Sequence, residues 1–163
     1  MRDEREELRQ LMDEFKTAIL VTRGRDGQYH ARPMQLHHNG PEGALWFSTS
    51  LDSQKVADLR ADPHCAVALH DGGSSPTYVS ISGIADLVQD RELIHEMWEP
   101  GWKAWFPDGP DERDLVLVRV RPLHAEYVNP KGGRAKVLAA MIRRLITHEH
   151  LEPDQKHQVD LPH

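Results

Sequence analysis

Basic and hydroxyl side chains gather between Arg32 and Lys55, at a spacing that would let one phosphate collect them. Arg32 falls in an expected strand, and Lys55 falls in the first turn of an expected helix. Between them come the hydroxyl groups of Ser48, Thr49, Ser50 and Ser53. Arginine binds phosphate through a planar fork, lysine binds it as a point charge, and a helix start offers free N–H groups to an anion. The pattern predicts a phosphate site, against the plainer interpretation of an exposed strand arginine and a solvated lysine.

Motifs for several other chemistries are missing from the sequence. It has neither a Walker loop nor G-x-G-x-x-G, which disfavours ATP and the usual dinucleotide pocket. The closest histidine pairs, His37-His38 and His148 with His150, lack a third ligand at a recognised spacing, so no metal site is expected. No paired carboxylates or Ser-His-Asp set can be identified, and the catalytic residues stay unassigned. The single cysteine, Cys65, has no visible base and is expected to be a small buried hydrophobe.

Length and composition narrow the class of protein. With 163 residues, the chain is expected to form one domain at residues 1–146, with terminal helices, followed by a polar tail at residues 147–163. Its net charge of −6 argues against a nucleic-acid partner, which would require a basic face. It has no apolar run of about 18 residues, so no membrane span is expected. The charged N-terminus does not resemble a signal peptide, and the expected compartment is the cytoplasm.

Hydrophobic periodicity and turn residues predict the elements that position these groups. Strands are expected at residues 17–22, 29–37, 44–49, 65–69, 78–88, 114–121 and 124–128. Helices are expected at residues 3–16, 53–60, 91–98 and 135–146, with Ser53 and Asp90 as N-caps. Gly83 is expected to bend or bulge its long strand. Six or seven short strands with inserted helices predict a mainly β protein with a small closed or half-closed barrel.

Several segments, taken in order, resemble the pyridoxamine 5'-phosphate oxidase-like family, whose members are FMN-binding split β-barrels with antiparallel, Greek-key-like strands. The closest resemblance is to its bacterial general stress protein branch. The matching segments are Arg32-Pro33-Met34, Leu45-Trp46-Phe47-Ser48-Thr49-Ser50, Ser53-Gln54-Lys55, Val79-Ser80-Ile81-Ser82-Gly83, Trp98-Glu99-Pro100, Lys103-Ala104-Trp105-Phe106-Pro107-Asp108-Gly109 and Glu126-Tyr127.

The resemblance implies an FMN site at the interface of a homodimer, with FAD as a second candidate. In the family, the strand after the flavin arginine runs beside the isoalloxazine ring, and the tryptophan segment helps to close the pocket. Pro100-Gly101 interrupts that segment here, which predicts a loop or broken helix, with core packing as the alternative for its tryptophans. The cofactor-binding residues implied are Arg32, Pro33, Met34, Gln35, Phe47, Ser48, Thr49, Ser50, Ser53, Lys55, Trp98 and Trp105.

Two differences from the oxidases proper weigh against oxidation of a vitamin B6 phosphate. Those enzymes carry a lysine five positions after the flavin arginine, where this chain has His37, and an Arg-x-His element that its C-terminal half lacks. The stress branch commonly has Asp-Asp-Pro-Asp before its late strand and tryptophan after Glu-Tyr. This chain has Asp111-Glu112-Arg113-Asp114 and Val128 there, which affects details of substrate and dimer rather than the flavin segment.

The leading hypothesis is therefore an FMN-dependent oxidoreductase of the general stress type, with a small-molecule redox partner. A protein that binds flavin without catalysis, for sequestration or sensing, would use the same residues. Haem or a deazaflavin in place of FMN is a third hypothesis, as for relatives in the superfamily.

Overall fold

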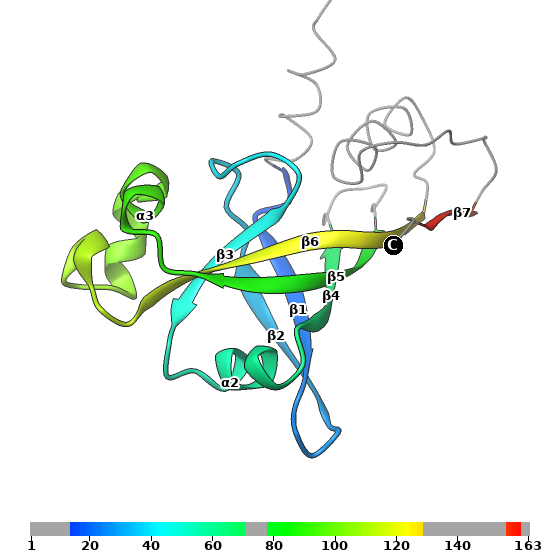
Figure 1. Ribbon diagram of the computed structural model, residues 1–163. Coiled ribbons are helices and arrows are strands. Elements are labelled where there is room, and N and C mark those ends of the chain that lie inside the picture. Colours follow the sequence, from blue (N-terminus) through cyan, green and yellow to red (C-terminus); the bar gives the residue numbers. More distant parts are fainter. Residues whose placement is uncertain (1–13, 71–77, 129–155, 161–163) are drawn as a thin grey trace, which may run out of the picture.

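Strands form where buried and exposed side chains alternate, because one face of each strand must reach the core. The computed structural model describes residues 14–70, 78–128 and 156–160. Its elements are β1 (Thr17–Arg23), β2 (Tyr29–Gln35), β3 (Leu45–Ser50), α2 (Gln54–Ala61), β4 (His64–His70), β5 (Tyr78–Val88), α3 (Arg91–Met97), the 3-10 helices η1 (Pro100–Ala104) and η2 (Gly109–Asp111), β6 (Leu115–Val128) and β7 (Lys156–Asp160), as Figure 1 shows.

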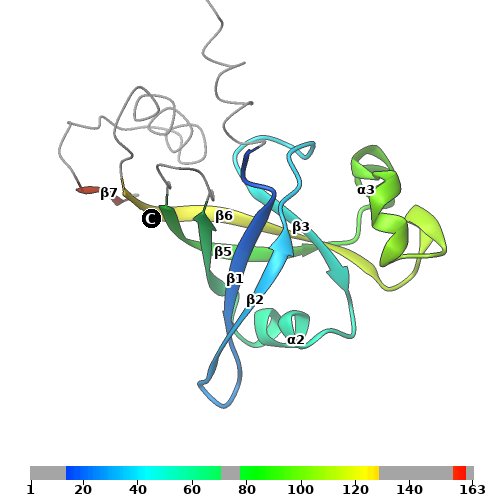
Figure 2. The same cartoon turned by 180° about the vertical axis from the view of Figure 1, so that it is seen from behind.

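The strands pair antiparallel in one curled sheet, in the order β2-β1-β4-β5-β6-β3. The two ends of this order approach each other at an isolated bridge between His37 and Trp46, where the His37 N–H donates to the Trp46 carbonyl oxygen at 2.9 Å. Away from the bridge, β2 and β3 part toward α2, which lies between the end of β3 and the β1–β2 hairpin (Figure 2). The fold is therefore a split barrel, mainly β with flanking helices, as the sequence predicts.

The last long strand differs from the sequence-based expectation. Two strands were expected, at residues 114–121 and 124–128, but β6 is continuous. Across from it, the register of β5 shifts between Ser82 and Gly83, so that Ser82 pairs with His124 and Gly83 pairs with Pro122. Leu123 is left without a partner, as in a β-bulge. Pro122 has no N–H for the ladder, and the bulge accommodates it inside the strand.

The two described helices begin near the residues expected as caps. Ser53 is the N-cap of α2, although its side chain makes no capping hydrogen bond. Asp90 caps α3, and its carboxylate accepts hydrogen bonds from the backbone N–H groups of Glu92 and Leu93. The tryptophan segment is interrupted as predicted, because α3 ends at Met97 and the 3-10 helix η1 follows at Pro100.

Apolar side chains form two clusters on opposite faces of the same strands. The larger fills the barrel and includes Phe47, Val118 and Val120. The smaller lies under α3 and includes Trp46, Trp102, Phe106, Leu115 and Leu117. Neighbouring residues of β3 and β6 thus point into different clusters, so both faces of these strands are buried. This explains their nearly continuous apolar sequences, LWF and LVLV.

Three sequence-based expectations lie outside the described residues: most of the helix at residues 3–16, the helix at residues 135–146, and the pair His148 and His150. Within the polar tail expected at residues 147–163, the structure has a short strand, β7, which pairs with β6. In the part of the chain that the structure describes, no helix is long and apolar enough to cross a membrane.

Candidate functional site

A cleft of about 390 Å³ is lined by residues of β2, of the end of β3 and of the start of α2. It contains every residue expected at the cofactor site except Phe47 and Trp98. The lining residues are Arg32, Pro33, Met34, Gln35, Ser48, Thr49, Ser50, Ser53, Lys55, Trp105 and Phe106. Segments that are far apart in the sequence therefore meet at one place.

The sheet topology explains why this cleft is open. β2 ends the strand order and is paired with β1 on one side only. Pro33 sits in this edge strand, where its missing N–H costs no ladder hydrogen bond. On the other side of the cleft, β3 ends at Ser50, and α2 begins four residues later. The open strand edge and the helix start together leave backbone and side-chain donors facing the cleft.

Arg32 is held in place by groups behind the cleft. Its Nη1 donates to Thr22 Oγ1 at 2.7 Å and to the Leu20 carbonyl oxygen at 3.3 Å. Its Nη2 lies 3.7 Å from Asp58 Oδ2. The Arg32 side chain is only 19% exposed, and this burial lowers its pKa despite the raising effect of Asp58. Its position is therefore fixed before any ligand arrives.

Lys55 brings a second positive charge to the same cleft. Its Nζ donates to Thr49 Oγ1 at 3.0 Å. Burial, followed by the charge of Arg32, lowers the pKa of Lys55. In the described structure Lys55 makes no ion pair with a carboxylate. The positive charges of Arg32 and Lys55 repel each other, so an anion bound in the cleft would stabilise both charged side chains.

Four residues with hydroxyl groups line the same cleft as these cations. Thr49 Oγ1 lies 3.4 Å from Ser53 Oγ, which connects the end of β3 to the N-cap of α2. Ser50 instead donates to Asp52 Oδ1 at 2.6 Å, and Ser48 Oγ lies 2.9 Å from His37 Nε2. Thr49, Ser53 and Lys55 are thus linked directly, whereas Ser48 and Ser50 already have other partners.

The aromatic residues expected at the site separate into two groups. Trp105 lines the cleft and is 77% exposed, so its indole is available to a ligand or to another subunit. Trp98 packs against the cluster under α3, with its ring 5.6 Å from that of Trp102. The Phe47 side chain is fully buried in the barrel core. Neither Trp98 nor Phe47 lines the cleft.

Asp58 was not identified from the sequence, although it organises the site. It is 1% exposed, and its Oδ2 accepts hydrogen bonds from Thr22 Oγ1 at 2.7 Å and His30 Nδ1 at 2.8 Å. Its Oδ1 accepts from Gln54 Nε2 at 2.9 Å. Burial alone would raise the pKa of Asp58, but the hydrogen bonds from His30, Gln54 and Thr22 lower it to about 2. The i, i+4 spacing of Gln54 and Asp58 on one helix is a common pattern and does not by itself indicate a buried carboxylate.

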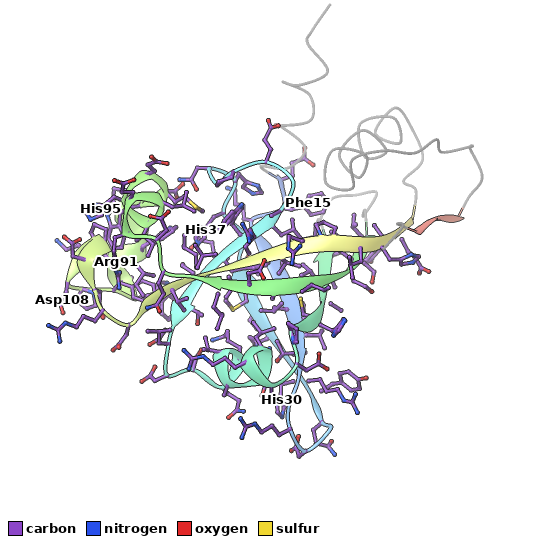
Figure 3. All side chains as sticks on the ribbon, in the orientation of Figure 1. Phe15, His30, His37, Arg91, His95 and Asp108 are labelled. Atoms are coloured by element: carbon purple, nitrogen blue, oxygen red, sulfur yellow. The ribbon has the colours of Figure 1, made fainter. Side chains whose placement is uncertain are left out.

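His37 is a buried partner of the cleft rather than part of its wall. The centroid of its ring lies 4.2 Å from that of Trp102, with the two rings tilted by 34°, and its Nε2 contacts Ser48 Oγ where the barrel closes. Figure 3 shows it between β3 and the segment around α3, whereas His30 lies beside α2. Burial, with the nearby charge of His38, lowers the pKa of His37 to about 4. At neutral pH its ring is therefore uncharged.

Two further expectations concern cysteine and metals. Cys65 is buried as predicted, and burial raises the pKa of its thiol to about 12. Such a thiol does not form the nucleophilic thiolate at neutral pH. Across residues 14–70, 78–128 and 156–160, no group of three histidine, cysteine or acidic side chains is arranged to hold a metal ion.

Comparison of the sequence with known proteins gives one family and two relatives. Residues 3–152 match the family described as "Pyridoxamine 5'-phosphate oxidase like". Protein bli-3 of Neurospora crassa is 30% identical over 131 residues, which cover 74% of this chain but only 62% of that protein. General stress protein 26 of Bacillus subtilis is 26% identical over 129 residues, which cover 78% of this chain and 89% of that protein.

Solved structures resemble the fold. General Stress Protein 26 from Bacillus anthracis has a TM-score of 0.66 and 24% identity, covering 77% of this chain and 94% of that one. A heme binding protein from Mycobacterium smegmatis has a TM-score of 0.60 and 17% identity, covering 86% of this chain and 61% of that one. At these identities the two structures support the fold alone.

Proposed function

The chain belongs to the pyridoxamine 5'-phosphate oxidase-like family, in its general stress protein branch, and we propose that it binds FMN in the cleft between β2 and β3. One observation carries the proposal: Arg32 and Lys55 line the same cleft, and the charge of Arg32 lowers the pKa of Lys55. With the linked hydroxyls of Thr49 and Ser53, they form a donor set that fits a phosphate monoester.

The residues of the cleft would divide the binding of FMN between them. Arg32 and Lys55 hold the phosphate, Arg32 from a fixed position and Lys55 from the helix start. The open edge of β2 at Pro33 to Gln35 leaves room for the flat ring in place of a neighbouring strand. Trp105 offers its exposed indole beside that ring. Bound FMN would supply the hydride and electron transfer, for which the protein provides position and electrostatics.

We propose that the flavin carries electrons between a reduced nicotinamide and a small-molecule acceptor. The described residues lining the cleft include no carboxylate or histidine, and hydride transfer to a flavin requires neither. The test is to mix the FMN-loaded protein with NADH or NADPH and to follow flavin absorbance. Bleaching with either donor supports an oxidoreductase. No bleaching with either would contradict this part of the proposal and favour a protein that binds flavin without catalysis.

Haem is a weaker candidate for this cleft, although a relative of similar fold is a heme binding protein. Among the described lining residues, the usual haem ligands histidine, cysteine and tyrosine are absent, and Met34 is the one thioether. His37 is 5% exposed and does not line the cleft. The absorbance spectrum of the purified protein distinguishes the two: flavin bands support the proposal, and a haem Soret band would overturn it.

Oxidation of a vitamin B6 phosphate also fits the cleft poorly. The position that carries a substrate-binding lysine in the oxidases proper is His37, which is buried behind Ser48 and uncharged at neutral pH. It therefore does not offer a positive charge to a second phosphate. Measurable oxidation of pyridoxamine phosphate would contradict this conclusion.

We further propose that the protein acts as a cytoplasmic homodimer with the flavin site at the interface. Trp105, on the rim of the cleft, and Tyr29, on the edge strand β2, are 77% and 73% exposed. Large exposed aromatic side chains are typical of surfaces that bind a partner. A second subunit placed against β2 would cover both the edge strand and the open side of the cleft. The single buried cysteine is compatible with a reducing compartment.

A further inference from the structure

Ser48 has a different environment from the other hydroxyl residues of the cleft. It is half-buried on β3, one residue before Thr49, which contacts Lys55 at the proposed phosphate site. In the described structure the one hydrogen-bond partner of Ser48 Oγ is His37 Nε2, at 2.9 Å. Ser50, by contrast, donates its proton to a carboxylate at 2.6 Å. Ser48 is therefore the cleft hydroxyl whose partner is a buried, uncharged side chain.

His37 holds this contact in a fixed position. Its backbone N–H donates to the Trp46 carbonyl oxygen at 2.9 Å, in the bridge that closes the barrel. Its ring is 5% exposed, and the ring centroid lies 4.2 Å from that of Trp102 (Figure 3). The backbone and the ring of His37 are both held by the fold, so the ring cannot turn away from Ser48 without disturbing the packing.

The imidazole of His37 leaves part of the hydrogen-bonding capacity of Ser48 to a ligand. A hydroxyl group has one donor site and two acceptor sites. Because the His37 ring is uncharged at neutral pH, it takes one of these sites, either as donor or as acceptor. The remaining sites suit a group that both donates and accepts. A ligand hydroxyl is such a group, whereas the oxygens of a phosphate dianion only accept.

Ser48 also connects the phosphate site with the aromatic part of the cleft wall. On one side, the next residue of β3 contacts Lys55. On the other side is Trp105, which lines the cleft and whose backbone N–H donates to the Trp102 carbonyl oxygen at 2.9 Å. The ring of His37 contacts both Ser48 and Trp102. A ligand that extends from the phosphate site to the aromatic wall therefore passes Ser48.

From these contacts we infer that Ser48 binds the hydroxyl groups of a polyol chain in the ligand, and that His37 is the positioning residue that orients Ser48. The inference rests on the proposed function, because it requires a ligand phosphate at Arg32 and Lys55. In FMN the ribityl chain joins the phosphate to the ring, so its hydroxyl groups reach the part of the cleft that Ser48 lines. The site then recognises a phosphorylated polyol rather than a phosphate alone.

The test measures how well ribitol 5-phosphate and inorganic phosphate displace FMN, followed by the recovery of flavin fluorescence. Ribitol 5-phosphate carries the phosphate and the polyol without the ring, and it should bind the wild type more tightly than inorganic phosphate does. In Ser48→Ala its inhibition constant should rise about three- to tenfold, because an ordinary hydrogen bond is lost. The constant of inorganic phosphate should keep its wild-type value, which also shows that the variant is folded.

The matched control is Ser80→Ala, at an exposed serine of β5 that does not line the cleft, and it should change neither constant. An unchanged ribitol 5-phosphate constant in Ser48→Ala, with FMN still displaced by inorganic phosphate, would overturn the inference and leave the proposed function standing. Equal weakening of both ligands would also overturn it, because Ser48 would then contact the phosphate. Failure of the wild type to bind FMN would overturn the proposed function as well.

Substitutions of His37 distinguish a positioning role from a purely structural one. His37→Leu should raise the ribitol 5-phosphate constant as Ser48→Ala does. His37→Gln should restore most of the binding, because its amide can replace the contact that Nε2 makes. Added to Ser48→Ala, His37→Leu should have no further effect on this constant, since it acts through Ser48. Additive effects of the two substitutions would overturn the role given to His37.

Discussion

At the residue scale, the cleft depends on a carboxylate that faces away from the proposed phosphate. Asp58 is buried on α2, and it accepts hydrogen bonds from three side chains while lying 3.7 Å from the Arg32 guanidinium. It balances the charge of Arg32 and fixes its orientation. A buried carboxylate with this many donors stabilises the fold only as long as it remains ionised.

Replacing Asp58 by asparagine should lower the free energy of unfolding at neutral pH by about 1–3 kcal/mol, since hydrogen bonds to a charged group are lost. The native pKa of Asp58 is lowered from 3.8 to about 2, so its stabilisation is complete above pH 3.8 and disappears as the pH falls toward 2. Urea unfolding of the wild type and D58N should therefore converge over this range. The exposed Asp114→Asn variant is the control, and a difference between wild type and D58N that does not change with pH would contradict the account.

His37 should make the fold less stable in mild acid. Its native pKa of about 4 is below the ordinary value of 6.5, so the unfolded chain binds the proton more readily. The free energy of unfolding should fall as the pH drops from 6.5 to 4, with a slope of up to roughly 1.4 kcal/mol per pH unit from this residue. In denaturant titrations at several pH values, the free energy of unfolding of His37→Gln should lack that slope. A variant at an exposed histidine, His70→Gln, should retain it. An equal slope in H37Q and the wild type would show that His37 is not responsible.

The sequence predicted the residues that line the cleft better than those that hold them in place. Arg32 and Lys55 could be found because cations near hydroxyls at a helix start have a recognisable chemistry. Asp58 could not, because its role depends on His30 and Thr22, which reach it only after β1, β2 and α2 have packed together. Trp98 and Trp105 lie in the same segment of the sequence. Only the folded structure shows that Trp98 packs against Trp102 in the core, whereas Trp105 lines the cleft.

At the scale of elements, most strands were predictable because alternation is a local property of the sequence. The main error concerned β6, where two strands were expected at residues 114–121 and 124–128. The register shift at Gly83 on the neighbouring strand allows Pro122 to remain inside a continuous strand. Such compensation between strands is not visible in either segment alone.

Gly83→Ala should therefore destabilise the barrel. A Cβ at this position would lie 2.6 Å from the backbone oxygen of Arg121 and 2.8 Å from Val120 Cγ1. Overpacking against backbone should lower the free energy of unfolding by about 1–3 kcal/mol. Gly101→Ala is the matched control, because nothing lies within 4 Å of the added Cβ and its effect should stay within about 0.5 kcal/mol. Equal melting temperatures for the two variants would show that Gly83 does not need to be a glycine.

At the scale of the whole molecule, the exposed edge strand and the exposed Trp105 lead to a prediction about assembly. Light scattering coupled to size-exclusion chromatography should give twice the chain mass of 18.6 kDa in the presence of FMN. Replacing Trp105 by serine should weaken the dimer, FMN binding or both, because this indole lies on the rim that they share. A stable monomer saturated with FMN would contradict the proposed interface site.

The central claim is that Arg32 and Lys55 bind the phosphate of FMN, and a fluorescence titration of FMN tests it most directly. Loss of Lys55 alone should weaken binding about ten- to a hundredfold, since hydrogen bonds to charged groups are worth roughly 1.5–3 kcal/mol each. Arg32→Ala/Lys55→Ala should weaken it at least about a hundredfold, while Arg113→Ala/Lys16→Ala binds like the wild type. Equal binding by the wild type and the Arg32/Lys55 variant, or no binding by either, would contradict the site.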